Sequence, residues 1–301
     1  QFRANIDRCI CVDQDKNVFF LVDNDGKFAA FMLNEEADKL ISLKSDINAL
    51  FNSPVLGYNS KDDIVYQFWA NRDSHEVYYF DPKTDYAPTT AISSISWDDP
   101  NFPNIEGFGV WAAKCNFTMG PDGKMYSRML GGNLVRIDVE NARGENLTNG
   151  DLVGTKDGSA YGLVFDPQDE NVFYFSNNDK HCIYKYDLRT KECACWAGQE
   201  GKSGYLDGPI GQAMFNKPGQ MCVDSEGNII LTDTENHCIR KITMSTGYVS
   251  TLAGKPQNSG YVNGSAEDAQ FKKPLGICID NDDVMYIGDS ENRAIRRLAV
   301  E

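Results

Sequence analysis

The sequence predicts an all-β fold, and three observations lead to this prediction. Residues 197–298 contain one pattern twice, since Phe215 and Arg240 recur 56 positions later as Phe271 and Arg296. One period holds four short β-rich runs that are separated by turn residues. The turn after the first run of a unit can be found six times along the chain. Because a fixed period is typical of repeat folds, and a small sheet cannot bury both of its faces alone, we expect a six-bladed β-propeller of four-stranded antiparallel blades.

The first four units carry the pattern more weakly than the last two. The opening segment 1–13 resembles 270–280, so the chain begins partway into a repeat and is expected to form one propeller domain over residues 1–301. The expected strands are 17–22, 27–33 and 40–44 in unit one; 55–58, 64–69, 76–81 and 91–96 in unit two; 115–119, 124–129 and 134–139 in unit three; and 162–166, 172–176, 182–187 and 193–197 in unit four. The turns between first and second strands begin near Asp13, Asn59, Gly120, Asp166, Asp224 and Asp280.

Turn residues separate the strands of the last two units. Gly227 and Gly247 can take a positive φ in the first and last turns of unit five. The expected strands are 220–224, 228–233, 237–242 and 248–252 in unit five, and 277–280, 284–287 and 294–300 in unit six. Unit six has no counterpart of the fourth strand. We therefore expect the ring to close with the help of a strand upstream of residue 1, or to close imperfectly, and we expect a preceding domain as well.

The two regular units resemble a known family. Pro218, Asp224 and Asp233, followed by the Asn-His-Cys-Ile-Arg-Lys run at 236–241, look like an NHL repeat, which is named after an Asn-His-Leu run at that place. The second copy departs from the pattern, with Arg293 in place of the histidine. Similar NHL propellers often recognise proteins or ligands, and some occur in bacterial cell-surface proteins behind an immunoglobulin-like (IPT/TIG) domain. The resemblance therefore implies a binding platform in a larger secreted or cell-surface protein, outside the cytoplasm.

Charge and hydropathy argue against some classes of partner. The chain has 29 Lys and Arg residues against 44 Asp and Glu residues, a net charge of -15 at pH 7. This charge argues against nucleic acid and anionic membranes as partners. No run approaches the ~20 apolar residues of a membrane helix, and no signal peptide is present. The expected partner is a protein, a glycan or a small molecule.

The nine cysteines follow the repeat and not a disulfide pattern. Cys11, Cys222 and Cys278 each lie two residues before the Asp that ends a strand, so they occupy equivalent and distant places. We expect the cysteines to be mostly reduced and buried, as small core residues. The alternative is a soft-metal site formed by four residues: His181, Cys182, Cys193 and Cys195.

No catalytic residue, metal site or cofactor is predicted. His181 and His237 are one repeat position seen twice, whereas a catalytic histidine has to meet a single nucleophile or metal. The sequence contains neither a Gly-x-Ser-x-Gly nucleophile motif nor a His-Glu-x-x-His zinc motif. The alternative is a propeller hydrolase or lyase, because six-bladed lactonases and amidating lyases look similar and hold a metal in the central channel.

Polar residues also recur after the second strand of the regular units. Asp233 and Asn236 have counterparts in Asp289 and Asn292. Asp and Asn side chains commonly bond their own backbone in tight turns, so turn capping is the expected role. The alternative is a polar ring on one face of the propeller.

Binding is predicted on the loop face, which is the face that carries the loops joining one blade to the next. These loops vary in length, and 97–114 is long and irregular, whereas the turns on the opposite turn face stay short. Residues just before each innermost strand should line the mouth of the central channel, and Asn52 is one of them. The candidate ligand-binding residues are Trp69, Arg72, Trp111, Arg128, Tyr161, Asn216 and Lys272, a mixture of aromatic, amide and cationic groups that suits recognition.

Overall fold

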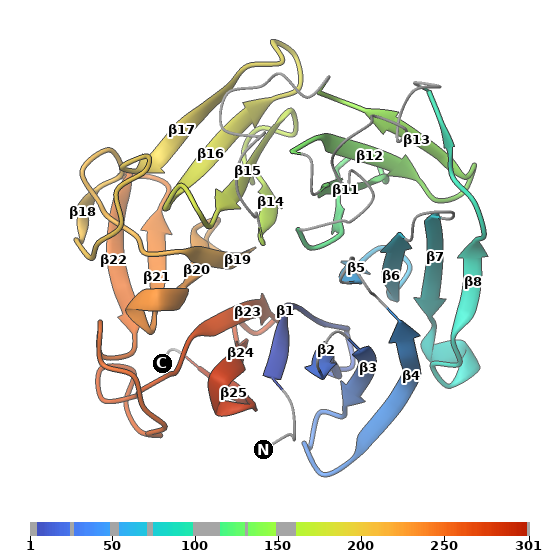
Figure 1. The fold of residues 1–301 in the computed structure, drawn as a ribbon, viewed down its shortest axis with the longest axis horizontal. Coiled ribbons are helices and arrows are strands. Elements are labelled where there is room, and N and C mark those ends of the chain that lie inside the picture. Colours follow the sequence, from blue (N-terminus) through green and yellow to red (C-terminus); the bar gives the residue numbers. More distant parts are fainter. Residues whose placement is uncertain are drawn as a thin grey trace.

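The computed structural model describes residues 5–24, 27–48, 54–70, 75–98, 115–129, 132–148 and 161–299. They form six β-sheets that surround a central axis as blades (Figure 1). The prediction of an all-β, six-bladed propeller is confirmed. The helices in this described part are three 3-10 turns: Pro82–Thr84, Thr234–Asn236 and Ser290–Asn292. None of them is long and apolar enough to cross a bilayer.

Three blades have the four antiparallel strands that the sequence predicts. Blade one has β1 (Asn5–Val12), β2 (Val18–Asn24), β3 (Lys27–Leu33) and β4 (Leu40–Asn48). Blade two has β5 (Val55–Asn59), β6 (Ile64–Ala70), β7 (His75–Phe80) and β8 (Thr89–Ile92). Blade four has β14 (Leu163–Phe165), β15 (Val172–Asn177), β16 (Cys182–Asp187) and β17 (Cys193–Gly198).

Blade three has five strands, two of which the sequence reading missed. Its sheet order is β10 (Thr118–Met119), β11 (Met125–Arg128), β12 (Leu134–Asp138), β13 (Arg143–Asn146) and β9 (Ser96–Trp97). β13 has the sequence RGEN, which lacks the β-branched and aromatic residues typical of strands. β9 lies parallel to β13 and places the Trp97 ring against Gly144, where a Cβ would overlap it. Packing of one tryptophan on a glycine therefore creates an outer pair that has no local sequence signal.

Blades five and six differ at their outer edges. Blade five has β19 (Pro218–Val223), β20 (Ile229–Asp233), β21 (Cys238–Thr243) and β22 (Tyr248–Ala253), with the short β18 (Gly208–Pro209) paired outside β22. Blade six has three strands among the described residues: β23 (Pro274–Ile279), β24 (Met285–Asp289) and β25 (Ala294–Leu298). β23 packs against β1, so the first and last blades are neighbours in the ring (Figure 1).

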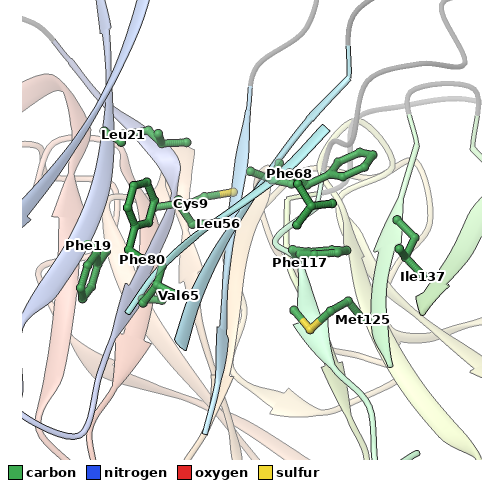
Figure 2. Close-up of a cluster of buried hydrophobic side chains, with 14 of the residues drawn as sticks. Cys9, Phe19, Leu21, Leu56, Val65, Phe68, Phe80, Phe117, Met125 and Ile137 are labelled. Atoms are coloured by element: carbon green, nitrogen blue, oxygen red, sulfur yellow. The ribbon is translucent and has the colours of Figure 1, made fainter. Parts of the chain in front are cut away.

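The core lies between the blades, where side chains of neighbouring sheets meet. Figure 2 shows one such cluster, in which Phe68 of blade two and Phe117 of blade three stack with their ring centroids 5.5 Å apart. Both rings are at most 1% exposed. Full burial of a phenylalanine side chain contributes about 2 to 3 kcal/mol, so such contacts hold adjacent blades together. The innermost strands are thereby fixed around the axis.

Candidate functional site

The axial channel contains a cavity of about 380 Å³. Innermost strands of five blades line it, with residues 10–12, 56–58, 60, 116–119, 220–223 and 277–279. These residues belong to the ends of the strands, next to the turns that lead to the second strands. The cavity therefore lies toward the turn face of the propeller.

Gln220 joins three blades at the wall of this cavity. Its Oε1 atom accepts hydrogen bonds from the backbone N–H of Ile10 at 3.1 Å and of Ile277 at 3.2 Å. Its Nε2 atom donates to the carbonyl oxygen of Ile10 at 2.9 Å. The side chain is 4% exposed. One amide of blade five thus bonds the innermost strands of blades six and one, where the ring closes.

A second amide side chain, that of Asn116, forms hydrogen bonds between blades three and four. Asn116 accepts from the backbone N–H of Leu163 at 2.7 Å and donates to its carbonyl oxygen at 3.2 Å. Between blades two and three, the N–H of Phe117 donates to the carbonyl of Leu56 at 2.9 Å. The inner edges of these strands are therefore bonded across blade boundaries, which fixes the cavity wall.

The turns on the turn face are also linked to one another. Asp283 of blade six accepts hydrogen bonds from the backbone N–H and the hydroxyl of Ser225 in blade five. The ammonium group of Lys16 in blade one lies 2.6 Å from Asp282. These contacts join blades five, six and one around the mouth of the cavity, so this rim is preformed.

The predicted ligand-binding residues are only partly described, and those that precede a described innermost strand, Tyr161, Asn216 and Lys272, lie at the strand end away from the cavity. Arg72 and Trp111 lie outside the described residues, as do Asn52 and the side chain of Trp69. Tyr161 and Asn216 are half-buried, and the backbone N–H of Asn216 donates to Asp233 at 2.7 Å. Lys272 is exposed and lies 3.4 Å from Glu291. The loop face as a binding site stays a prediction.

Arg128 is placed differently from the other candidates. It is the last residue of β11, and its side chain is fully buried. Burial lowers the pKa of its guanidinium group, although Cys115 and Cys193 nearby act in the opposite direction. The side chain of Arg128 is therefore not exposed to a ligand at the mouth of the channel.

Arg240 has a structural role that the sequence reading did not assign. Its side chain is completely buried between the rings of Tyr205 and Phe215, at 4.9 and 5.2 Å from their centroids. It lies 2.6 Å from Asp233 and 2.7 Å from Asp207. Burial raises the pKa of the Asp233 carboxyl to about 6, although Arg240 acts in the opposite direction. This arrangement, which we call the arginine clamp, fixes the loop before β19 onto β21.

Blade six repeats the arginine clamp at the positions that the 56-residue period gives. Arg296 lies 2.8 Å from Asp289 and donates to Asn263 at 2.7 Å, and the rings of Tyr261 and Phe271 flank it. Asn236 and Asn292 each donate to the Asp of their own blade at 2.8 Å. The recurring polar residues thus form buried clamps. The recurrence of Arg240 and Arg296 was the signal that could have revealed this role. The expected turn capping was wrong for Asp233 and Asp289, whose side chains make no capping hydrogen bond to the 3-10 turns that follow them.

His181 and His237 both join blades. His181 and His237 adopt a positive φ of 56° and 59° at the start of a third strand. Their Nδ1 atoms accept from the backbone N–H of Lys217 at 3.1 Å and of Lys273 at 3.2 Å, in the next blade. Burial lowers the pKa of both rings. The contacts agree with the structural role that their recurrence suggested.

All nine cysteines are free thiols. Seven are buried, and Cys193 and Cys195 are half-buried. A hydrogen bond with Cys195 and burial raise the pKa of Cys182. Among the described residues, no group of three or more His, Cys, Asp or Glu side chains is arranged to hold a metal ion. The Cys182 cluster is therefore not a metal centre in this geometry.

Comparison with known proteins supports the repeat assignment. Residues 215–242 match the NHL repeat model. The chain is 25% identical over 271 residues to Protein SUPPRESSOR OF QUENCHING 1, chloroplastic, of Arabidopsis thaliana, which covers 83% of this chain and 25% of that protein. It is 30% identical over 152 residues to NHL repeat-containing protein 2 of Gallus gallus, or 50% of this chain and 19% of that protein. The chain thus spans a quarter or less of these relatives.

Solved structures show the same fold over nearly the whole chain. An auxiliary nutrient binding protein from Bacteroides thetaiotaomicron has a TM-score of 0.74 at 20% identity, covering 97% of this chain and 68% of that one. A second one, from Bacteroides ovatus, has a TM-score of 0.75 at 20% identity, covering 99% and 70%. Virginiamycin B lyase from Staphylococcus aureus has a TM-score of 0.55 at 12% identity, covering 97% and 80%. With its 56-residue repeat, its matched segment and its six blades, the chain is a six-bladed β-propeller that contains an NHL repeat at residues 215–242.

Proposed function

We propose that this propeller is a binding module that takes a ligand in its axial cavity. The observation that carries the proposal is the cavity itself, whose volume of about 380 Å³ lies within the range of small-molecule sites. Its wall is preformed, because Gln220 and Asn116 bond the innermost strands across blade boundaries. The two Bacteroides proteins of the same fold are named auxiliary nutrient binding proteins, which supports a binding role.

The proposal extends to the setting of the module. Residues 1–301 are one domain of a larger secreted or cell-surface protein, outside the cytoplasm. The match to a quarter or less of longer relatives and the similarity to nutrient binding proteins support this setting.

A ligand screen by thermal shift tests the binding role. A ligand at about 100 times its Kd stabilises the folded protein by about 2.7 kcal/mol, which raises Tm measurably. Ser60 is an exposed residue that lines the cavity, so Ser60→Trp should obstruct the cavity and abolish the shift. Ser245→Trp is the matched control, because Ser245 is exposed in an outer turn away from the cavity. If a ligand raises the Tm of Ser60→Trp as much as that of the wild type, the axial site is wrong.

The same hits test the loop face predicted from the sequence. Trp111→Ala with Tyr161→Ala removes two aromatic candidates and leaves the buried Arg128 in place. Loss of binding in this double variant, with binding retained in Ser60→Trp, would move the site to the loop face.

An enzyme of the hydrolase or lyase class is the alternative function. The similarity to virginiamycin B lyase concerns the fold alone, at 12% identity. Metal analysis of the purified protein tests this alternative, since a stoichiometric divalent ion that is lost in Ser60→Trp would favour metal-dependent chemistry in the channel.

A further inference from the structure

The wall of the axial cavity contains sulfur-bearing side chains, whereas the turns around its mouth contain carboxylates. Its walls include Met119, Met221, Cys222 and Cys278, with aliphatic side chains between them. Burial raises the pKa of Cys222 and of Cys278, so both thiols are uncharged at neutral pH. The body of a ligand in this cavity would therefore meet a wall that exposes polar and apolar atoms in about equal measure, with sulfur atoms among them.

The inner wall offers one hydrogen-bond donor to a ligand. One N–H of the Gln220 amide donates to Ile10, and the Oε1 atom is occupied by two backbone N–H groups. The second N–H of this amide has no partner among the described residues. Because the side chain is 4% exposed and lines the cavity, an acceptor on a ligand can satisfy this donor.

The mouth of the cavity is strongly acidic. The five lining strands lead into the turns 13–17, 59–63, 120–124, 224–228 and 280–284. These turns contain ten Asp and Glu residues against three lysines. Such an excess of one sign around a cleft raises the local concentration of oppositely charged ligands.

Some of these carboxylates already have a cationic partner. Lys16 pairs with Asp282, Lys241 with Asp224 and Glu226, and Arg136 with Asp122. The remaining six have no ion pair with any described residue. They are Asp13, Asp15, Asp62, Asp63, Asp280 and Asp283.

From these observations we propose that the axial cavity takes a small organic cation. The ligand carries an ammonium group at the acidic mouth, a short alkyl body along the mixed wall that includes Met119 and Met221, and a hydrogen-bond acceptor that reaches the second N–H of Gln220. This inference rests on the proposed function, because it names the ligand class of the same cavity.

Three amides with the same number of carbon atoms test the ligand class by calorimetry: 6-aminohexanamide, hexanamide and adipic acid monoamide. They share an amide acceptor and an alkyl body, and they differ at the other end, which is an ammonium group, a methyl group or a carboxylate. We expect 6-aminohexanamide to bind at least about tenfold tighter than hexanamide, and the anion not to bind. Raising the salt from about 20 mM to about 300 mM should weaken binding several-fold, because the screening length shortens.

Neutralisation of the mouth tests where the charge acts. Asp15 and Asp62 are exposed, so Asp15→Asn with Asp62→Asn should fold normally and bind 6-aminohexanamide several-fold more weakly. Glu192→Gln with Glu267→Gln makes the same change in net charge at exposed positions that do not line the cavity, and should bind as wild type. An equal effect in both double variants would overturn the local role of the mouth.

The outcomes separate this inference from the proposed function. If hexanamide binds as tightly as 6-aminohexanamide and Ser60→Trp abolishes both, the axial site stands and the cation class is wrong. If none of the three compounds binds, the cation class is wrong as well, and the screen then decides the axial site independently.

Discussion

Arg240 shows how one buried charge can hold a loop in place. Removing a guanidinium and a carboxylate from water is expensive, and the pair is retained when its geometry and additional hydrogen bonds offset this cost. Arg240 meets this condition, because it donates to the carbonyl oxygens of Met214 and Leu206 in addition to its two Asp partners. A second copy in blade six, built on Arg296, has the same partners by position.

Replacement of Arg240 should be strongly destabilising. Arg240→Met leaves the fully buried Asp233 without its cation, and breaking a buried pair in this way costs about 3 to 5 kcal/mol. Urea unfolding measures the loss. Arg240→Met with Asp233→Leu should recover part of it, since the unpaired carboxylate is gone. If Arg240→Met lowers the free energy of unfolding no more than the double variant does, the unpaired carboxylate is not the cause of the loss.

The two histidines should make stability depend on pH. In the unfolded chain a histidine has a pKa of about 6.5, and burial lowers it in His181 and His237. Between these two values the unfolded chain binds more protons, so the free energy of unfolding falls as the pH falls below about 6.5. Protonation would also remove the Nδ1 acceptor for Lys217 and Lys273.

The variant His181→Asn with His237→Asn isolates this effect. Asn keeps an acceptor near the Nδ1 position and tolerates the positive φ, but it does not titrate. Thermal melts of the variant and the wild type should agree at pH 7.5 and diverge toward pH 5, with the wild type losing more. If the Tm values of the two proteins change equally between pH 7.5 and pH 5, the histidines do not contribute to the pH dependence of stability.

At the scale of the strand, hydrogen bonds between the innermost strands of different blades hold the ring together. The innermost strands have one edge paired within the blade and the other facing the axis. Gln220 bonds this second edge in β1 and β23, and Asn116 bonds it in β14. Amide side chains suit this task because each can donate and accept at once.

Loss of the Gln220 bridge should loosen the ring where it closes. Gln220→Leu removes three hydrogen bonds and leaves the N–H groups of Ile10 and Ile277 buried without these partners, which costs on the order of 3 kcal/mol. Chemical denaturation measures the loss. Gln212→Leu is the control, since Gln212 is exposed and should change stability by less than about 0.5 kcal/mol.

The sequence predicts strands well where the pattern is local and misses them where packing decides. The strand 182–187 is found at its observed bounds because it alternates and carries β-branched and aromatic residues. β13 is missed because RGEN gains its structure from Trp97 and β12. The axial cavity and the Gln220 bridge could not be predicted, since they depend on contacts between residues 210 positions apart.

At the scale of the whole molecule, the blades are held together by buried side chains and not by covalent crosslinks. Every cysteine is described and free. The expectation that equivalent cysteines lie in distant places was wrong for Cys11, Cys222 and Cys278, which line one axial cavity from three blades, but all three are free thiols as expected. The ring therefore depends on packing for its integrity.

Thiol titration checks this property. A thiol reagent should react with at most Cys193 and Cys195 in the native protein, since the other seven thiols are buried. All nine should react after denaturation without reductant. Fewer than about half appearing under those conditions would indicate disulfides instead.

The repeated arginine clamp has a consequence for how the molecule opens. Blades five and six carry matching buried networks, and His237 bonds one to the other. Native proteins exchange their amide hydrogens through local openings of cooperative units, and the units with the most buried contacts open least. We therefore expect the amide hydrogens of these two blades to exchange slowly and together, and local opening to begin in other blades of the ring.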